Sequence, residues 1–184
     1  MDKENIKKEL TVRHTSFVDF LFGLTNEGFL TSHNEKWAAG QQLEHIYLSV
    51  KPVRQALGVP KILLKLLLGQ ANRPGRNYDE LVDKYRSKLQ SGGKAPGRFV
   101  PKVITIEKGQ QLKTKLAKEI ARLCSKLDRF TEEELDRYVL PHPLLGKLTL
   151  REMMYFTLYH VGHHQELVRR YLEVNTADQK GVIS

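Results

Sequence analysis

Side chains that would face a protein interior recur at helical spacing in four stretches of the chain. In the first stretch the steps between them alternate between four and three residues, which keeps them on one face of an α-helix. These positions are Leu10, His14, Phe17, Leu21 and Leu24. Thr25, Asn26 and Gly28 follow directly and indicate the end of this helix.

A second helix is expected from about Lys36 to Val50. Pro52 is expected to end it, because proline has no N–H to donate within a helix. The apolar surface of this helix comes from Trp37, Ala38, Leu43, Ile46 and Leu48. Gln41 and His45 are four residues apart, so the helix also carries two polar side chains on one stripe.

The third and fourth stretches are the most regular. The third stripe consists of Leu112, Leu116, Ile120, Leu123, Leu127 and Phe130. Thr131 and Glu134 then form a capping-box pattern that opens a short turn of helix.

The last helix has a well-specified start. Pro141 and Pro143 precede it, and Thr149 with Glu152 forms a second capping box. Its inward seam again alternates steps of four and three, through Leu150, Met154, Thr157, Val161, His164, Val168 and Tyr171. The seam therefore includes a histidine.

Residues 69–105 are rich in turn-forming residues and hold one short helical piece near residues 78–89. No run of alternating strand residues stands out elsewhere. Four amphipathic helices and one long connection predict an all-α four-helix bundle with a crossover between its second and third helices. A length of 184 residues suits one domain, 1–184.

The net charge of +9 originates in one region. Residues 51–105 contain twelve Lys or Arg and three acids, whereas the rest of the chain has eighteen of each. These cations are scattered among Gly and Pro, which favours a solvated loop over a phosphate-binding surface. No finger, aromatic-strand or recognition-helix motif accompanies them, so nucleic acid is not expected as a partner.

The chain is expected to be soluble and cytoplasmic. Its first residues lack the apolar core of a signal peptide, and the longest apolar stretch, residues 62–68, is far too short to cross a membrane. The lone Cys124 fits a reducing compartment, and its position on an apolar helix indicates packing rather than nucleophilic chemistry. No serine-hydrolase elbow, P-loop or dinucleotide fingerprint is present.

Candidate chemistry concentrates in the segment YHVGHHQ, residues 159–165. His160 and His164 are four residues apart, so their directions differ by roughly 40° around a helix and both rings can reach one point. This spacing is the one by which helices chelate zinc and similar metals. The same spacing also fits a core histidine beside a surface one. His163 lies on another face. Its expected role is one of three: a group that supports the ligands, a general acid or base, or a solvated side chain.

A third ligand would decide between these alternatives, and four histidines are candidates. His45 is the best of them because it lies well inside an apolar helix and needs an internal polar partner. His14 is its rival, and the alternative for it is a helix-end histidine bonded to a carbonyl or to water. His33 is typical of a loop or cap, and His142 lies between two prolines that restrict the chain.

The Trp37–His45 segment and the stretch HPLLGKLTLREMMYFTLYHVGHHQ, residues 142–165, resemble the DinB/YfiT-like superfamily. The resemblance covers most of the chain. It implies a four-helix bundle with a three-histidine metal site, and it maps the ligands onto His45, His160 and His164. The basic crossover is longer than in compact members of that family.

The resemblance also implies a function. One divalent ion, with zinc favoured and nickel, manganese or iron as alternatives, would leave a coordination position open for water or substrate. Some DinB-like proteins are thiol-dependent transferases or isomerases, and the resemblance therefore implies a metal-dependent S-transferase that uses a low-molecular-weight thiol and a small-molecule substrate. A metal-dependent hydrolase, a metal-stabilised binding or stress-response protein, a metal-free bundle and a homodimer remain alternatives.

Overall fold

The computed structural model describes the backbone of residues 1–32 and 36–181, and side chains as far as Glu173. Its elements are α1 (Lys3–Phe22), α2 (Asn26–Leu30), α3 (Ala39–Leu57), α4 (Lys61–Leu68), α5 (Tyr78–Gln90), the 3₁₀ turn η1 (Gly97–Phe99), α6 (Ile106–Leu127), α7 (Glu132–Arg137), β1 (Val139–His142), β2 (Gly146–Thr149) and α8 (Leu150–Gly181). Within the described residues, no helix is both long enough and apolar enough to cross a membrane.

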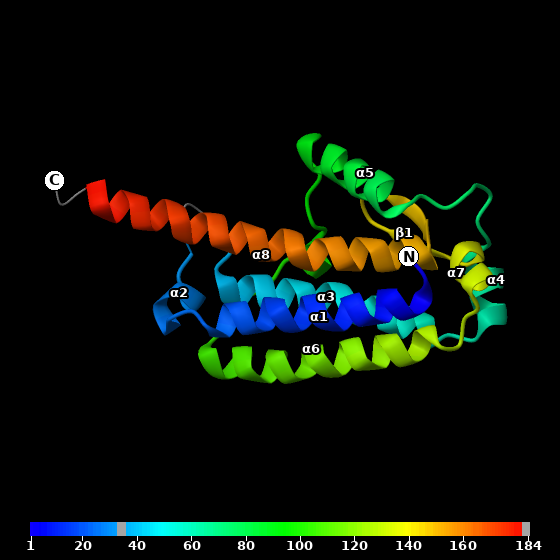
Figure 1. Ribbon diagram of the computed structural model, residues 1–184, viewed down its shortest axis with the longest axis horizontal. Coiled ribbons are helices and arrows are strands. Elements are labelled where there is room, and N and C mark those ends of the chain that lie inside the picture. The colour runs from blue at the N-terminus through cyan, green and yellow to red at the C-terminus, as the bar shows by residue number, and fades with distance from the viewer. Residues whose placement is uncertain (33–35, 182–184) are drawn as a thin grey trace.

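Four long helices, α1, α3, α6 and α8, lie side by side and form the body of the molecule (Figure 1). The colours show that α1 and α8 run in one direction and α3 and α6 in the other. Because α3 and α6 run the same way, the chain must return along the bundle between them. Residues 58–105 make this return and carry α4, α5 and η1. The predicted four-helix bundle with a long crossover is confirmed.

The core lies between the predicted apolar stripes. Phe17, Leu43, Leu123 and Leu158, one from each long helix, are fully buried. The capping box at Thr149 also forms as predicted, because the Thr149 hydroxyl accepts from the Glu152 amide and the Glu152 carboxylate accepts from the Thr149 amide. The start of α8 is thereby fixed, and with it the direction in which the histidines of this helix point.

The second helix differs from its prediction at both ends. It starts at Ala39, so Trp37 lies outside it, and it passes through Pro52 to end at Leu57. Proline in a helix removes one hydrogen bond and costs about 3 kcal/mol. Buried Val53 and Leu57 lie beyond Pro52 on the same face, and their burial offsets this cost.

A short β-hairpin was not predicted. β1 pairs with β2 in antiparallel register, from Val139 opposite Thr149 to His142 opposite Gly146. Gly146 closes the turn at a φ of 77°, a conformation that favours glycine. Strands of four residues are too short to show a clear alternation in sequence. The hairpin packs against the first turns of α8 and contributes one wall of the site described below.

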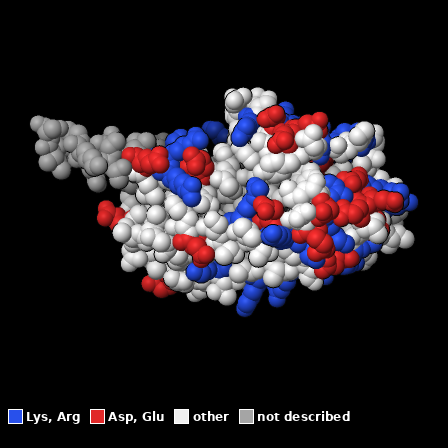
Figure 2. All heavy atoms as spheres, in the orientation of Figure 1, with Lys and Arg blue, Asp and Glu red and all other residues white. Residues whose placement is uncertain are grey.

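The basic crossover is not simply a solvated loop. Arg73 and Arg76 both bind the carboxylate of Glu152, whose side chain is 0% exposed. Burial alone would raise the pKa of this carboxyl, but hydrogen bonds from Arg73 and from backbone amides bring the pKa below its usual value. The interpretation as solvated charge is therefore wrong for these two arginines, which fasten the crossover to α8. Elsewhere cations and anions alternate on the surface, most densely at the end formed by α4 and α7 (Figure 2).

Candidate metal centre

Three buried histidines meet between α3 and α8. His45 comes from α3, and His160 and His164 come from successive turns of α8. Nε2 of His160 lies 3.2 Å from Nε2 of His45 and 3.0 Å from Nε2 of His164. The side chains of all three are at most 5% exposed. The same ring nitrogen of each residue is thus directed at one point inside the protein.

The other nitrogens of two of these rings are held by oxygen acceptors. Nδ1 of His45 donates to the carbonyl oxygen of Phe99 at 2.7 Å, and Nδ1 of His164 donates to the amide oxygen of Gln42 at 2.5 Å. The amide nitrogen of Gln42 faces the Trp37 carbonyl, which can only accept, so the amide orientation is consistent. Since both Nδ1 atoms carry the proton, Nε2 of His45 and of His164 present lone pairs.

Burial keeps the three rings neutral. It lowers the pKa of His160 and of His164 well below the usual value, and neighbouring histidines lower both further. Burial also lowers the pKa of His45, although the hydrogen bond to Phe99 opposes the change. Neutral imidazole is the form that binds metals.

The arrangement fits a tetrahedral metal site. Ligands about 2.05 Å from an ion at tetrahedral angles lie about 3.3 Å from one another, close to the two Nε2 separations observed. All three potential ligand atoms lie within 4.8 Å of each other. Without a cation, Nε2 of His160 can donate a hydrogen to only one of its two neighbours, Nε2 of His45 and Nε2 of His164. The lone pair of the other neighbour would then stay unsatisfied. The triad could therefore hold a metal ion.

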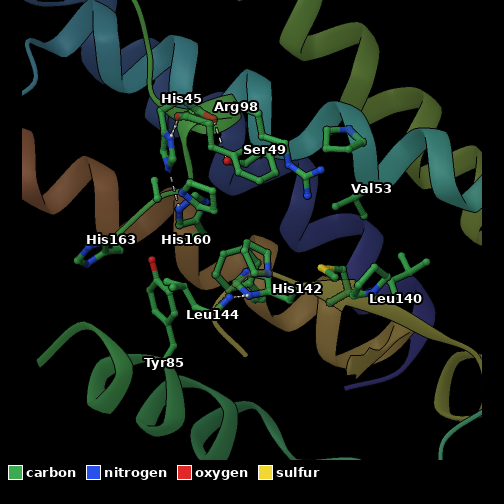
Figure 3. Close-up of a pocket in the computed structure, with 18 of the residues that line it drawn as sticks. His45, Ser49, Val53, Tyr85, Arg98, Leu140, His142, Leu144, His160 and His163 are labelled. Carbon is green, nitrogen blue, oxygen red and sulfur yellow. Dashed lines mark hydrogen bonds between the residues drawn. The ribbon is translucent and has the colours of Figure 1, made fainter. Parts of the chain in front are cut away.

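A cavity of about 390 Å³ opens on one side of the triad. Its walls come from α3, α5, the η1 turn, the β-hairpin and α8, as the close-up shows (Figure 3). Most of the lining is apolar, including Val53, Leu140, Leu144 and Phe156. A ligand in this cavity would reach the triad without crossing the protein core.

Comparison with known families agrees with this geometry. The sequence model of the DinB superfamily matches residues 8–168, which is most of the chain. The chain belongs to the DinB superfamily. A solved structure described as TT2238, a four-helix bundle protein, superposes with a TM-score of 0.58 at 14% identity, over 92% of this chain and 99% of that one. That likeness shows the shared fold. None of the curated proteins matches the chain.

The histidines predicted as alternatives have other surroundings in this DinB protein. His14 is buried between α1 and α6, where Nδ1 donates to the Leu10 carbonyl and Nε2 has no partner within the described part of the chain. His142 accepts from the backbone amides of Leu144 and Leu145 and thereby shapes the hairpin turn. His33 lies outside the described residues. Of the candidates, the structure brings His45, His160 and His164 together.

His163 lies at the edge of the DinB cavity and outside the triad. Its ring is half-buried and stacks on Tyr159, with centroids 5.9 Å apart at 19°. Burial lowers its pKa, and the nearby cations Arg170 and Arg86 lower it further. The side chain is therefore a neutral wall of the cavity near neutral pH.

The sequence pattern did not predict the contacts that three residues make with the triad. Gln42, and not Gln41, contacts the triad, because Gln41 caps the start of α3 by accepting from the Ala38 amide. The spacing of three between Gln42 and His45 was a usable signal. Phe99 contacts His45 through a backbone carbonyl from the crossover, which leaves no trace in side-chain patterns. Trp37 packs over His45 and His164 from just before α3.

Proposed function

We propose that this DinB protein is a metal-dependent enzyme of the thiol S-transferase type, with one divalent ion on His45, His160 and His164. The observation that carries the proposal is the convergence of three neutral Nε2 atoms beneath a cavity. Sites closed by four protein ligands are typical of structural zinc, whereas three protein ligands with an open position are typical of catalysis. Zinc suits the three imidazoles best, and nickel, manganese or iron would also accept them.

The protein residues would prepare this site before any ion arrives. The acceptors on Gln42 and Phe99 fix the rings of His164 and His45, so that little conformational entropy is lost when an ion binds. The ion would supply a Lewis acid that lowers the pKa of a thiol or a water at the open position. The Trp37 ring covers two of the ligands and limits access of bulk water.

In the proposed reaction, a thiol and an electrophilic small molecule meet in the cavity. The thiol gives its proton to solvent, its sulfur forms a bond to an electrophilic carbon, and the bond from that carbon to the leaving group breaks. The apolar walls would hold the electrophile and keep competing water away. A low-molecular-weight thiol is a component of the cytoplasm, so the proposal includes a cytoplasmic location.

Metal content of untagged protein is the first test. Plasma mass spectrometry of the wild type should give about one divalent ion per chain, and His45→Ala or His160→Ala should abolish it. His163→Ala is the matched control, because this histidine lies on the same helix outside the triad, and it should keep the ion. Wild type that stays metal-free after incubation with each of the four metals would exclude the proposal.

Turnover is the second test, because a metal-stabilised binding protein would pass the first. Loaded wild type should accelerate conjugation of glutathione or cysteine with chlorodinitrobenzene or monochlorobimane, and His160→Ala should lose the acceleration. Loaded protein that is inert with every pair, yet unfolds at a higher temperature than the metal-free form, would identify a binding or stress-response role. Release of product from an ester without any thiol would instead identify a hydrolase.

A further inference from the structure

The cavity beside the triad is apolar over most of its lining. Pro52 and Val53 of α3, Leu89 of α5 and Met153 of α8 contribute hydrocarbon surface. The triad forms one polar end, and Arg98 of the η1 turn forms another. No Asp or Glu belongs to the lining within the described part of the chain. A volume near 390 Å³ lies at the lower end of the range for small-molecule sites.

Arg98 differs from the other arginines of the crossover. Arg73 and Arg76 bind Glu152. Among the described residues Arg98 has no carboxylate partner, and its guanidinium stacks over the Phe99 ring at 4.8 Å from the centroid. Figure 3 shows this side chain turned into the cavity on the side of Ser49 and Val53. A planar cation free of partners at an apolar wall is suited to a carboxylate, which it can bind through two parallel hydrogen bonds.

Tyr85 supplies a hydrogen-bond donor on the opposite wall. Its ring is 5% exposed and packs edge-on against Phe156 and His163. The hydroxyl points into the cavity toward His160 and His163 (Figure 3). Burial raises the pKa of this phenol, so it stays protonated and donates. No group of the described residues accepts from it, which leaves the donor for a bound molecule.

We propose that the cavity binds an organic substrate with a compact apolar body and one carboxylate, which pairs with Arg98 while the body lies between Val53, Phe156 and Leu144. The inference rests on the proposed function, because the same molecule would present its electrophilic carbon to the triad. Tyr85 is assigned as a positioning residue that donates to a polar atom of the body. A second carboxylate would find no cation in this lining.

Phenylacetate and its neutral analogue phenylacetamide are the probes, and binding is measured by calorimetry with wild type and with Arg98→Gln. Arg98 is exposed, so its replacement should leave the fold intact. Wild type should bind the carboxylate at least tenfold more tightly than the amide, and Arg98→Gln should remove this preference. Arg86→Gln is the matched control, because Arg86 is an exposed arginine on α5 that contacts Tyr159 outside the lining. It should keep the preference.

Each titration is run on metal-loaded and on chelator-treated protein, which separates this inference from the proposed function. A tenfold preference that depends on Arg98 in both forms supports the inference, even if no metal is found and the enzyme proposal fails. A preference seen only in loaded protein and kept by Arg98→Gln means that the carboxylate binds the ion, and it overturns the inference. Equal affinity of wild type for the two probes, or no binding of either, also overturns it.

Tyr85→Phe tests the second polar contact. The probes for this variant are 4-methoxyphenylacetate and 4-methoxyphenylacetamide, because phenylacetate has no polar atom other than the group that pairs with Arg98. Tyr85→Phe should weaken both three- to tenfold and leave the ratio between them unchanged, because the hydroxyl donates to the methoxy oxygen, which is distant from Arg98. Unfolding temperature serves as the check on structure. A variant that folds as wild type does and binds each probe as tightly as wild type does would show that Tyr85 is not part of the site.

Discussion

The amide oxygen of Gln42 lies 2.5 Å from Nδ1 of His164, across the contact between α3 and α8. The Gln42 side chain is 2% exposed and its amide nitrogen faces the Trp37 carbonyl, so the amide has one orientation that satisfies both contacts. The pair fixes which nitrogen of His164 points at the other two histidines. A residue that touches no ion would thus determine how well an ion is held.

Gln42→Met should weaken metal binding 10- to 100-fold, as loss of such supporting hydrogen bonds typically does. Methionine fills a similar volume but accepts poorly. Gln41→Met is the control, because it removes a helix-capping contact one residue away and leaves the triad untouched. Titration against a competing chelator measures both. Equal affinities of the two variants would show that Gln42 does not orient His164.

His14 should make the protein less stable in mild acid. Burial lowers its pKa from an ordinary 6.5 to about 4. Between these two values the unfolded chain binds a proton that the folded chain does not, so stability falls as the pH drops through this window and levels off below it. The loss amounts to about 3 kcal/mol at most.

His14→Leu removes this titration and the unpartnered Nε2. Urea unfolding at several pH values gives the free energy of unfolding of each protein as a function of pH. The two curves should diverge as the pH falls from 6.5 to 4, with the variant more stable than the wild type. Both proteins carry the same triad, so its protonation cancels in the difference. Parallel curves over this range would mean that His14 is already charged or free to reach water.

Two helical glycines should respond oppositely to alanine. A Cβ at Gly109 of α6 would lie 2.8 Å from the ring of Phe29, and a Cβ at Gly40 of α3 would lie 2.7 Å from the same ring. Gly109→Ala should therefore destabilise the protein by about 1–3 kcal/mol, although alanine has a better helix propensity than glycine. A Cβ at Gly162 of α8 meets nothing within 4 Å, so Gly162→Ala should stabilise by about 0.5–1 kcal/mol. Thermal unfolding tests both, and two changes of the same sign would contradict this packing.

Glu152→Gln in α8 should lower the free energy of unfolding more than Glu134→Gln in α7 does. Both glutamates close capping boxes and bind cations, but Glu152 is 0% exposed with two arginines, whereas Glu134 is 22% exposed with Lys61. The glutamine variants keep the caps and lose the charges. We expect a loss of about 2–3 kcal/mol at Glu152, which is less than a fully buried ion pair would give because the two arginines reach solvent. At Glu134 we expect a loss of about 1 kcal/mol or less. Denaturant midpoints measure both, and equal costs would show that burial of Glu152 adds nothing.

The long helices and the triad could be predicted because they depend on periodic side chains. The seam of α8 placed His164 inside, and the four-residue step placed His160 next to it. The position of His45 followed from the apolar helix around it and from the family resemblance. These are properties that one segment of chain displays on its own.

Other features depend on segments that meet only after folding. The passage of α3 through Pro52 is favoured by the burial of Val53 and Leu57, which no local rule at a proline indicates. The pairing of Arg73 and Arg76 with Glu152 joins residues almost eighty positions apart. Charge composition alone could not distinguish these arginines from Arg98, which has no such partner among the described residues.

The separation of His45 and His160 by 115 positions has a consequence for the life of the protein in a cell. An ion held by both would tie together two helices from distant parts of the chain, and unfolding would require it to leave. At a free metal concentration one hundred times Kd, this adds about 2.7 kcal/mol to the free energy of unfolding. Scarcity of the metal would then increase the unfolded fraction that proteases remove, so the abundance of the protein would follow metal supply.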